Sequence, residues 1–595
     1  MTLNILELPD EVIVSILAHL TGPDIRRCRS TCQRFADAVK SSLLLLFLIE
    51  LDDAGYTEAS NPRTDVSIEE KYSILKEHNY RRRNHKYRVT YKLKLGPMSD
   101  GFSLETEALT APWKQLFKDG VLAQWSSVLP DSYMPLQLDL VLLPSCNTGR
   151  EFKQWRLVEP TIRVREFDIE PAYDLLVLLE YDLGDTVGPA NRCRLHFRTL
   201  STNDEHPDAV IGHIDCDIST AFDLGLRVEC FGDTVVFYIP NGSNSGLTFG
   251  QEDTTGLLLY NWTTGALLDL STMQLPRFIT VVSKELLIAP RSTFTYGLRN
   301  SPIGQLDIYE VDWSNNPSIN FVAALQLPII DTIPVPPPGL HGLSSSHTAL
   351  VLFLKSGNSS SLSNSGVHAR GPAQIFEWNR SSQILILHIG LPHLARSPGV
   401  SYQKISSYIY IPAAIIYDIL GSYRKSFAAY QSNIISWEQW GLRTRWIHGH
   451  LAEVLNFQAL PLGSKCIQVK GISQTSNTRV RILDFNPRLL EQLEHWHSQQ
   501  ASDAAGPARS YSGWVYQPAE PNDETPTDSC VPPHTWLKGS GANQAVAPYA
   551  WSLVENEDLH RVMKRADRSM RLVWDAEHIV MLQGNTNEET VVLSI

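Results

Sequence analysis

Cysteine is scarce in this chain, and the cysteines that occur are scattered. The eight cysteines among 595 residues include no C-x-x-C pair. This pattern indicates reduced and mostly buried thiols, and it argues against a disulfide framework or a zinc site. We therefore expect a protein of the cytoplasm or the nucleus.

Long hydrophobic runs are also missing. The longest apolar stretches, residues 43–49 and 411–416, are far shorter than the roughly 20 residues of a membrane-spanning helix. Asp10 and Glu11 come too early for a secretory signal, and no basic leader precedes an apolar core. A net charge of −13 is unsuited to general nucleic-acid binding. The sequence thus predicts no membrane and no nucleic-acid partner.

The common catalytic motifs are absent as well. The sequence contains no Gly-rich phosphate loop, no G-x-S-x-G elbow and no H-E-x-x-H motif. No spacing of Asp and Glu singles out a general acid and base. His495 and His497 are two histidines without clustered ligands, which is a weak metal signal. We expect no enzymatic activity, no cofactor and no metal site.

An amphipathic pattern is present in the first 40 residues. Pro9 suits the first turn of a helix, and Pro23 starts a second helix after a stop at Gly22. Apolar residues recur at helical spacing over both segments: Val12, Ile13, Ile16, Leu17, Leu20, Ile25, Cys28, Cys32 and Phe35. Helices this short cannot bury so much apolar surface by themselves. The pattern therefore predicts a partner surface, in this chain or in another.

This segment resembles an F-box. The family pattern is Leu-Pro, an acidic residue two positions after the proline, an aliphatic helix, a Pro-Asp-aliphatic restart and Cys-x-x-aromatic. The chain matches it at Leu8, Pro9, Glu11, Ile16, Leu17, Leu20, Pro23, Asp24, Ile25, Cys32 and Phe35. Phe35 replaces the usual Trp, and residues 41–47 stand where a Leu-Trp pair is usual.

The resemblance implies a three-helix F-box module over residues 1–50. An F-box docks onto the Skp-family adaptor of a cullin-type ubiquitin ligase, so the resemblance implies these two partners. It also implies that the adaptor contacts lie at Leu8, Pro9, Val12, Ile16, Leu17, Leu20, Ile25, Cys28, Cys32 and Phe35.

After the F-box the pattern changes. Residues 51–86 read as a helical linker, and residues 76–94 are locally basic, which predicts a solvated face or a nuclear localisation signal. Residues 87–595 contain short apolar runs of strand length separated by turns, which predicts a mainly β domain. Within it we expect a low-complexity loop over 356–366 and a disordered insertion over 498–547.

A recurring strand–turn–strand unit narrows the β architecture. It occurs at Trp262 and again at Trp378, each following an apolar strand. This order resembles a propeller blade, so we expect a degenerate β-propeller of six to eight blades. A large β-sandwich or two β domains are the alternatives. In a propeller, both tryptophans should lie at blade exteriors between neighbouring sheets.

The propeller interpretation makes two further predictions. The strands near Leu175, Val235, Leu350, Ile467 and Ile579 should be inner strands that point toward one axis. The C-terminal strand at residues 591–593 should close the ring by pairing with the first β region, because an unpaired edge is prone to association.

Two functions fit the sequence. The first is a substrate receptor, in which the F-box binds the adaptor and the β domain binds a target protein. The second is a non-ligase interaction scaffold with an F-box-like helical cap. The sequence does not name the target, because recognition is carried by loops that have no transferable code.

Overall fold

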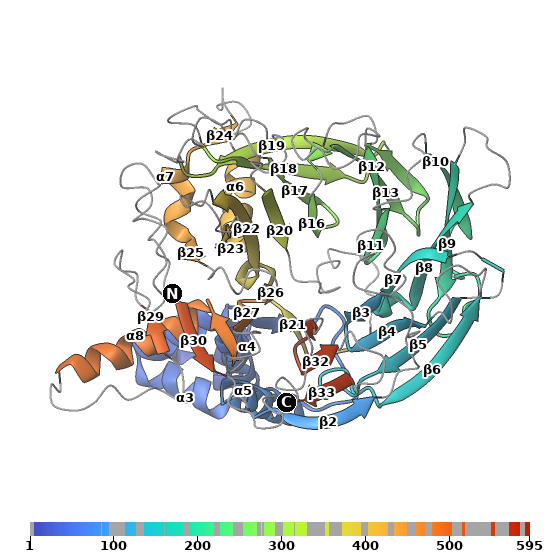
Figure 1. Cartoon of the computed structure of the whole chain (residues 1–595). Coiled ribbons are helices and arrows are strands. Elements are labelled where there is room, and N and C mark those ends of the chain that lie inside the picture. The colour runs from blue at the N-terminus through green and yellow to red at the C-terminus, as the bar shows by residue number, and fades with distance from the viewer. Residues whose placement is uncertain are drawn as a thin grey trace.

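Seven sheets of four or five strands make up most of the computed structural model, and Figure 1 shows them arranged as a ring. The structure describes residues 5–84, 86–93, 114–126, 136–159, 161–162, 164–182, 191–218, 226–241, 254–270, 275–276, 279–291, 302–314, 316–329, 351–355, 372–393, 403–425, 433–448, 459–470, 479–502, 515–517, 549–553, 571–582 and 590–594. The predicted loop over 356–366 lies outside these residues. Within the described residues the fold is a seven-bladed β-propeller, so the predicted propeller of six to eight blades is confirmed.

Blades 1 to 3 come first in the chain, and their strands follow in order from the innermost outward. Blade 1 is β3 (Gln115–Lys118), β4 (Val121–Ser126), β5 (Leu136–Leu142) and β6 (Lys153–Glu159). Blade 2 is β7 (Val164–Glu170), β8 (Leu175–Asp182), β9 (Asn191–Thr199) and β10 (His213–Ile218). Blade 3 is β11 (Arg227–Phe231), β12 (Thr234–Asn241), β13 (Thr254–Asn261) and β14 (Ala266–Asp269), with β15 (Leu275–Pro276) also paired to β13.

Blades 4 to 7 complete the ring. Blade 4 is β16 (Thr280–Ser283), β17 (Leu286–Arg291), β18 (Gln305–Asp312), β19 (Ser318–Gln326) and β24 (Ile434–Ile435). Blade 5 is β20 (Val351–Lys355), β22 (Ile384–His393), β23 (Gln403–Pro412) and β25 (Arg445–His448). Blade 6 is β26 (Ala459–Leu462), β27 (Lys465–Lys470), β28 (Arg479–Asp484), β30 (Tyr549–Leu553) and β29 (Val515–Gln517). Blade 7 is β31 (Arg571–Trp574), β32 (His578–Leu582), β33 (Thr590–Ser594) and β2 (Arg88–Leu93).

Blade 7 closes the ring, because its strands come from both ends of the β region. The C-terminal β33 pairs antiparallel with β2, with Val592 opposite Tyr91. The predicted closure is therefore confirmed. A buried apolar cluster also lies between each pair of neighbouring blades, including Val592 of blade 7 against Leu122 of blade 1. The core is thus a closed circle of seven inter-blade interfaces.

Four of the five positions predicted to lie in inner strands are next to the innermost strand of their blade. The strands at Leu175, Val235, Ile467 and Ile579 are β8, β12, β27 and β32, which are second in their blades. Second strands are covered by a neighbouring blade on both faces, so they carry the most continuous apolar runs. β8 shows this directly, since all five residues from Leu175 to Leu179 are 0% exposed. Leu350 lies outside the described residues, and the strand after it, β20, is first in its blade.

Of the two predicted Trp hairpins, one is confirmed and the other is wrong. Trp262 directly follows β13, and the turn to β14 closes at Gly265, whose φ of 76° suits glycine. The Trp262 side chain is fully buried in the cluster between blades 2 and 3. Trp378 instead belongs to β21 (Phe376–Trp378), which pairs with β1 (Tyr56–Glu58).

The helices lie before the propeller or in its connections. The α-helices are α1 (Asp10–Leu17), α2 (Gly22–Thr31), α3 (Gln33–Ser41), α4 (Leu43–Ala54), α5 (Ile68–Arg83), α6 (Ala413–Lys425), α7 (Trp437–Trp440) and α8 (Pro487–Ser502). The 3-10 helices are η1 (Ile5–Glu7), η3 (Pro171–Tyr173), η6 (Arg380–Ser382) and η7 (Gly441–Arg443). The N-terminal module has four α-helices where three were predicted, because the side chain of Ser42 accepts from the N–H of Leu45 and starts α4.

The predicted disordered insertion over 498–547 contains two ordered pieces. Ser498–Ser502 is the last turn of α8, and β29 (Val515–Gln517) pairs with β30 at the rim of blade 6. The remaining residues of that range lie outside the described part of the chain. The segment between residues 50 and 86, predicted as a helical linker, contributes the strand β1 as well as α5.

One face of the ring carries the N-terminal helices. Strand pairing places the first–second and third–fourth turns of blades 1 to 6, and the first–second turn of blade 7, on the same face. β21, α8 and the turn before His578 all belong to such connections, and each contacts the N-terminal segment. Figure 1 shows α3, α4, α5 and α8 grouped beside blades 6 and 7.

Candidate protein-binding site

The N-terminal helices enclose a small core of their own. Ile13 and Leu17 from α1 meet Ile25 from α2, Val39 from α3 and Leu45 from α4. Leu17 is 3% exposed and Ile25 is 0% exposed. Two of the ten expected contact residues therefore hold the module together and do not face outward.

Other expected residues of α1 do face outward. Val12 is 41% exposed and Ile16 is 40% exposed, and their spacing of four places them on one side of the helix. Pro9 is exposed one turn earlier, and Ile5 beyond it is 44% exposed. We call Ile5, Pro9, Val12 and Ile16 the α1 apolar face.

The remaining five expected contact residues are neither fully buried nor fully exposed. Each is half-buried in the module: Leu8, Leu20, Cys28, Cys32 and Phe35. Sequence reasoning missed Leu43 and Leu44, which are 39% and 37% exposed at the start of α4. The run of four leucines there was a usable signal, because one helix face cannot bury four consecutive side chains.

Polar contacts fix the start of α1 and the start of α2. The Arg34 guanidinium donates to the carbonyl oxygen of Leu8 (2.5 Å) and lies 3.4 Å from the Asp10 carboxylate. The Thr21 hydroxyl donates to Asp24 (2.7 Å), and this bond lowers the pKa of the Asp24 carboxyl. These contacts hold the start of α1, which carries the α1 apolar face, and the start of α2 beside it.

An ion-pair network attaches the module to blade 6. Asp52 of α4 pairs with Arg26 of α2 and with Arg488 of α8, whose Nε lies 3.2 Å away. The Asn486 side chain donates to the carbonyl oxygen of Asp53 (3.0 Å). Burial raises the pKa of the Asp53 carboxyl, although the Arg26 charge opposes this. The helices and the propeller are therefore joined by buried and half-buried polar contacts.

The segment after α4 is built into the propeller face. Tyr56 of β1 packs between Phe376 and Trp378 of β21, with both ring-centroid distances at 4.5 Å. The Arg82 guanidinium lies 4.6 Å from the Trp378 ring centroid and donates to the Tyr56 hydroxyl. Arg82 is only 4% exposed. The expected solvated face of the basic stretch is therefore wrong at this residue, because Arg82 packs inside the junction.

A loop of blade 1 also holds this junction. Asn147 Oδ1 accepts from the N–H groups of Ile375 (2.9 Å) and Phe376 (3.0 Å), and its Nδ2 donates to the Phe376 carbonyl oxygen (2.9 Å). The carboxylate of Glu577 in blade 7 accepts from the N–H of Asn147 (3.2 Å). β1 and β21 therefore connect the helical module to blades 1, 5 and 7.

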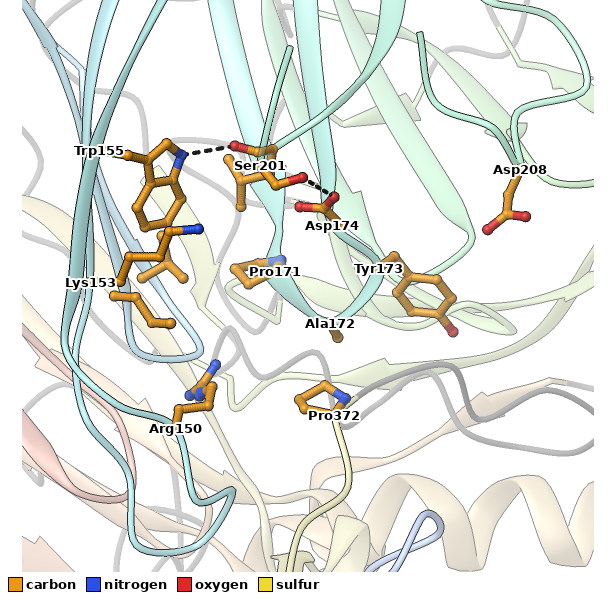
Figure 2. Close-up of a pocket in the computed structure, with 13 residues that line it drawn as sticks. Arg150, Lys153, Trp155, Pro171, Ala172, Tyr173, Asp174, Ser201, Asp208 and Pro372 are labelled. Atoms are coloured by element: carbon orange, nitrogen blue, oxygen red, sulfur yellow. Dashed lines mark hydrogen bonds between the residues drawn. The ribbon is translucent and has the colours of Figure 1, made fainter. Parts of the chain in front are cut away.

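A cavity of about 610 Å³ opens between blades 1 and 2 on the face that carries the module. Figure 2 shows Arg150, Lys153 and Trp155 on one wall, with Tyr173 and Asp208 across from them. Most of its residues come from the turns that follow β5, β7 and β9 and from the start of β6, and Val121, Leu142 and Pro372 complete the lining. No motif in the sequence pointed to it, because the lining combines separate turns.

Metal ligation and membrane insertion find no support in the described part of the chain. Those residues contain no group of three or more His, Cys, Asp or Glu side chains placed to hold a metal ion. No helix among them is long and apolar enough to span a membrane.

Comparison with known proteins identifies the N-terminal module. Residues 5–47 match the F-box domain family. The chain therefore carries an F-box domain followed by a seven-bladed β-propeller. An F-box domain implies binding to a Skp1-type adaptor, and a propeller suggests protein binding.

No curated protein matches the chain. Among solved structures, the N-terminal domain of Nup159 aligns with 11% identity and a TM-score of 0.29, covering 86% of this chain and 95% of that chain. A Saccharomyces cerevisiae Dbp5 complex with Nup159, Gle1, IP6 and ADP aligns with 10% identity and a TM-score of 0.26, covering 66% and 78%. A Bombyx mori GH32 β-fructofuranosidase aligns with 11% identity and a TM-score of 0.22, covering 88% and 95%. With TM-scores this low, the propeller is defined by its strand pairing alone.

Proposed function

We propose that this protein is the substrate-recognition subunit of a Skp–cullin–F-box ubiquitin ligase. Its F-box binds the adaptor, its propeller binds a target protein, and it performs no chemistry itself. The observation that carries the proposal is the α1 apolar face inside the matched F-box segment. Exposed apolar residues gathered on one helix of a folded module mark a protein contact.

We infer the residues that contact the adaptor from the exposure of their side chains. Pro9, Val12 and Ile16 face outward and make the central contacts, with Leu8 and Phe35 at their margin. Leu17 and Ile25 support this face from beneath, since both are buried in the module core.

The attachment of the module to the ring supports a receptor role. Asp52, Asn147 and Arg82 tie the F-box and its following segment to blades 1, 5, 6 and 7. A target bound to the propeller is therefore held at a fixed position relative to the adaptor. Such positioning is what a ligase requires of a receptor, because effective concentration depends on geometry.

The test is calorimetric binding of the full chain to a purified Skp-family adaptor. Val12→Glu combined with Ile16→Glu should weaken binding by at least about tenfold, because each change places a charge in the contact. Both side chains are already exposed, so the propeller should unfold at the wild-type temperature. The matched control is Leu267→Glu on β14, where the side chain is 50% exposed outside the F-box.

Three outcomes decide the proposal. Weaker binding by the double variant with an unchanged Leu267→Glu control supports it. Equal binding by the wild type and the double variant refutes the assignment of the α1 apolar face. Adaptor binding without recruitment of a cullin would favour the non-ligase scaffold.

We also propose that the protein works in the cytoplasm or the nucleus, where the adaptor and cullin partners of an F-box act. Fluorescence microscopy of the tagged full chain tests this, and a secreted or membrane-bound signal would contradict it.

A further inference from the structure

We propose that the cavity between blades 1 and 2 binds an acidic peptide segment of the target protein. This inference rests on the proposed receptor function and specifies where the propeller holds its target. At about 610 Å³, the cavity falls within the range of roughly 300–1,000 Å³ typical of ligand sites. We infer the kind of ligand from the charged and aromatic side chains that line the cavity.

Two cations lie on the same wall of the cavity. Arg150 and Lys153 come from the end of the β5–β6 connection and the start of β6. The Arg150 side chain is half-buried, and Lys153 is exposed. A guanidinium binds a carboxylate through paired hydrogen bonds. A carboxylate of the peptide would therefore be attracted to this wall by both positive charges.

The Trp155 indole lies on the same wall, and a hydrogen bond fixes its position. The indole N–H of Trp155 donates to the carbonyl oxygen of Leu200 in blade 2 (3.1 Å), so Trp155 bridges the two blades. Lys153 Nζ lies 5.1 Å from the Trp155 ring centroid. A peptide can therefore place an apolar side chain on the indole beside an acidic side chain at the cations.

Two carboxylates, those of Asp174 and Asp208, also line the cavity. The Ser201 hydroxyl donates to Asp174 (2.6 Å), as Figure 2 shows, so Asp174 already holds a hydrogen bond. Asp208 is exposed on the far side from Arg150. The lining is thus polarised, and an acidic group is favoured at the Arg150 wall and disfavoured near Asp208. This polarity sets the orientation of the peptide.

The position of the cavity matters for the ligase. Pro372, which leads to β21, lines one edge of it. Arg63, from the segment between β1 and α5, packs against Gly149 next to Arg150. A peptide seated in this cavity lies on the F-box face of the ring.

The test uses the full chain and random linear peptides displayed on phage. Selected peptides are synthesised, and their binding is measured by fluorescence anisotropy. We expect enrichment of peptides that carry Asp or Glu beside an apolar residue. Replacing that acidic residue by its amide should weaken binding by at least about tenfold, and binding should weaken as salt is added.

Paired variants separate charge from damage to the fold. Arg150→Gln and Lys153→Gln should each weaken binding of the selected peptide by about three- to tenfold or more, whereas Asp208→Asn should strengthen it. All three side chains line one cavity, so general disruption would weaken binding in every variant. Arg194→Gln, a surface change in β9 outside the cavity, should leave peptide binding unaltered.

Several results would overturn the proposal. They are an absence of enriched peptides, enriched peptides without acidic residues, Arg150→Gln and Lys153→Gln variants that bind as the wild type does, and succinate binding as tightly as the peptide. Adaptor binding is measured on the same variants and should not change. These measurements therefore distinguish a failure of the peptide-binding proposal from a failure of the F-box assignment.

Discussion

Tyr91 of β2 lies opposite Val592 of β33, and this pairing joins the first strand of the β region to the last. Both strands belong to blade 7, whose inner strands also pack against blade 1. Ring closure therefore depends on a segment of five residues at the C-terminus, β33 (Thr590–Ser594).

Deleting residues 590–595 should destabilise the whole propeller. β2 would lose its partner strand and β32 would lose one of its two, and the cluster between blades 7 and 1 would open. We expect loss of cooperative thermal unfolding by circular dichroism. The milder change Leu593→Ala, at a fully buried side chain, should cost about 2–5 kcal/mol. A truncated chain that unfolds at the wild-type temperature would contradict the role of β33.

Replacing Asn147 by Asp should loosen the junction between the F-box and the ring. A carboxylate still accepts from the N–H groups of Ile375 and Phe376, but it cannot donate to the Phe376 carbonyl oxygen. We expect a loss of about 1–3 kcal/mol and faster proteolysis between β1 and α5. Thr148→Ala in the same loop is the neighbouring control. Equal proteolysis of both variants would rule out this role for Asn147.

The F-box and the closed ring could be read from the sequence because each rests on local or terminal patterns. Leu8, Pro9 and Glu11 fall within one helix start, and the apolar C-terminal strand needed a partner. The sequence pattern could not predict which individual side chains of a helix are exposed. Leu17 and Val12 both fit the helical stripe, yet one is buried and the other is 41% exposed.

The junction was missed because it joins segments far apart in the chain. Trp378 resembled Trp262 in its hairpin-like neighbourhood, but β21 pairs with β1 through main-chain groups that have no sequence signature. Arg82 looked solvated for the same reason, since its neighbours Tyr56 and Trp378 come from two distant segments. Tertiary contacts decided both positions.

Trp262 should be a strong stability determinant between blades 2 and 3. Its indole N–H donates to the Gly232 carbonyl oxygen (3.0 Å), and its ring lies 4.6 Å from the His206 ring. Trp262→Ala should cost about 3–5 kcal/mol in a denaturant titration. Trp313 makes a similar bond to the Lys284 carbonyl oxygen (2.7 Å) but is only half-buried. Trp313→Ala should therefore cost less, and the reverse order would refute the assignment.

His78 should make the junction sensitive to acid. Burial lowers the pKa of His78 from 6.5 to about 3, with the Arg82 charge adding to the effect. The unfolded chain therefore takes up a proton below about pH 6.5, while the folded chain does so only near pH 3. Stability from this group is present above pH 6.5 and falls as the pH drops, by up to about 1.4 kcal/mol per pH unit.

Comparison with His78→Phe isolates this contribution. A phenyl ring keeps the packing against Phe376, whose centroid lies 5.2 Å from that of His78, and removes the titrating group. The variant loses the 3.1 Å hydrogen bond to the Tyr56 hydroxyl, so its stability at pH 7 should be somewhat lower. Between pH 6.5 and pH 4, however, its free energy of unfolding should fall less steeply than that of the wild type. Parallel curves from urea titrations across this range would show that His78 is not held neutral by burial.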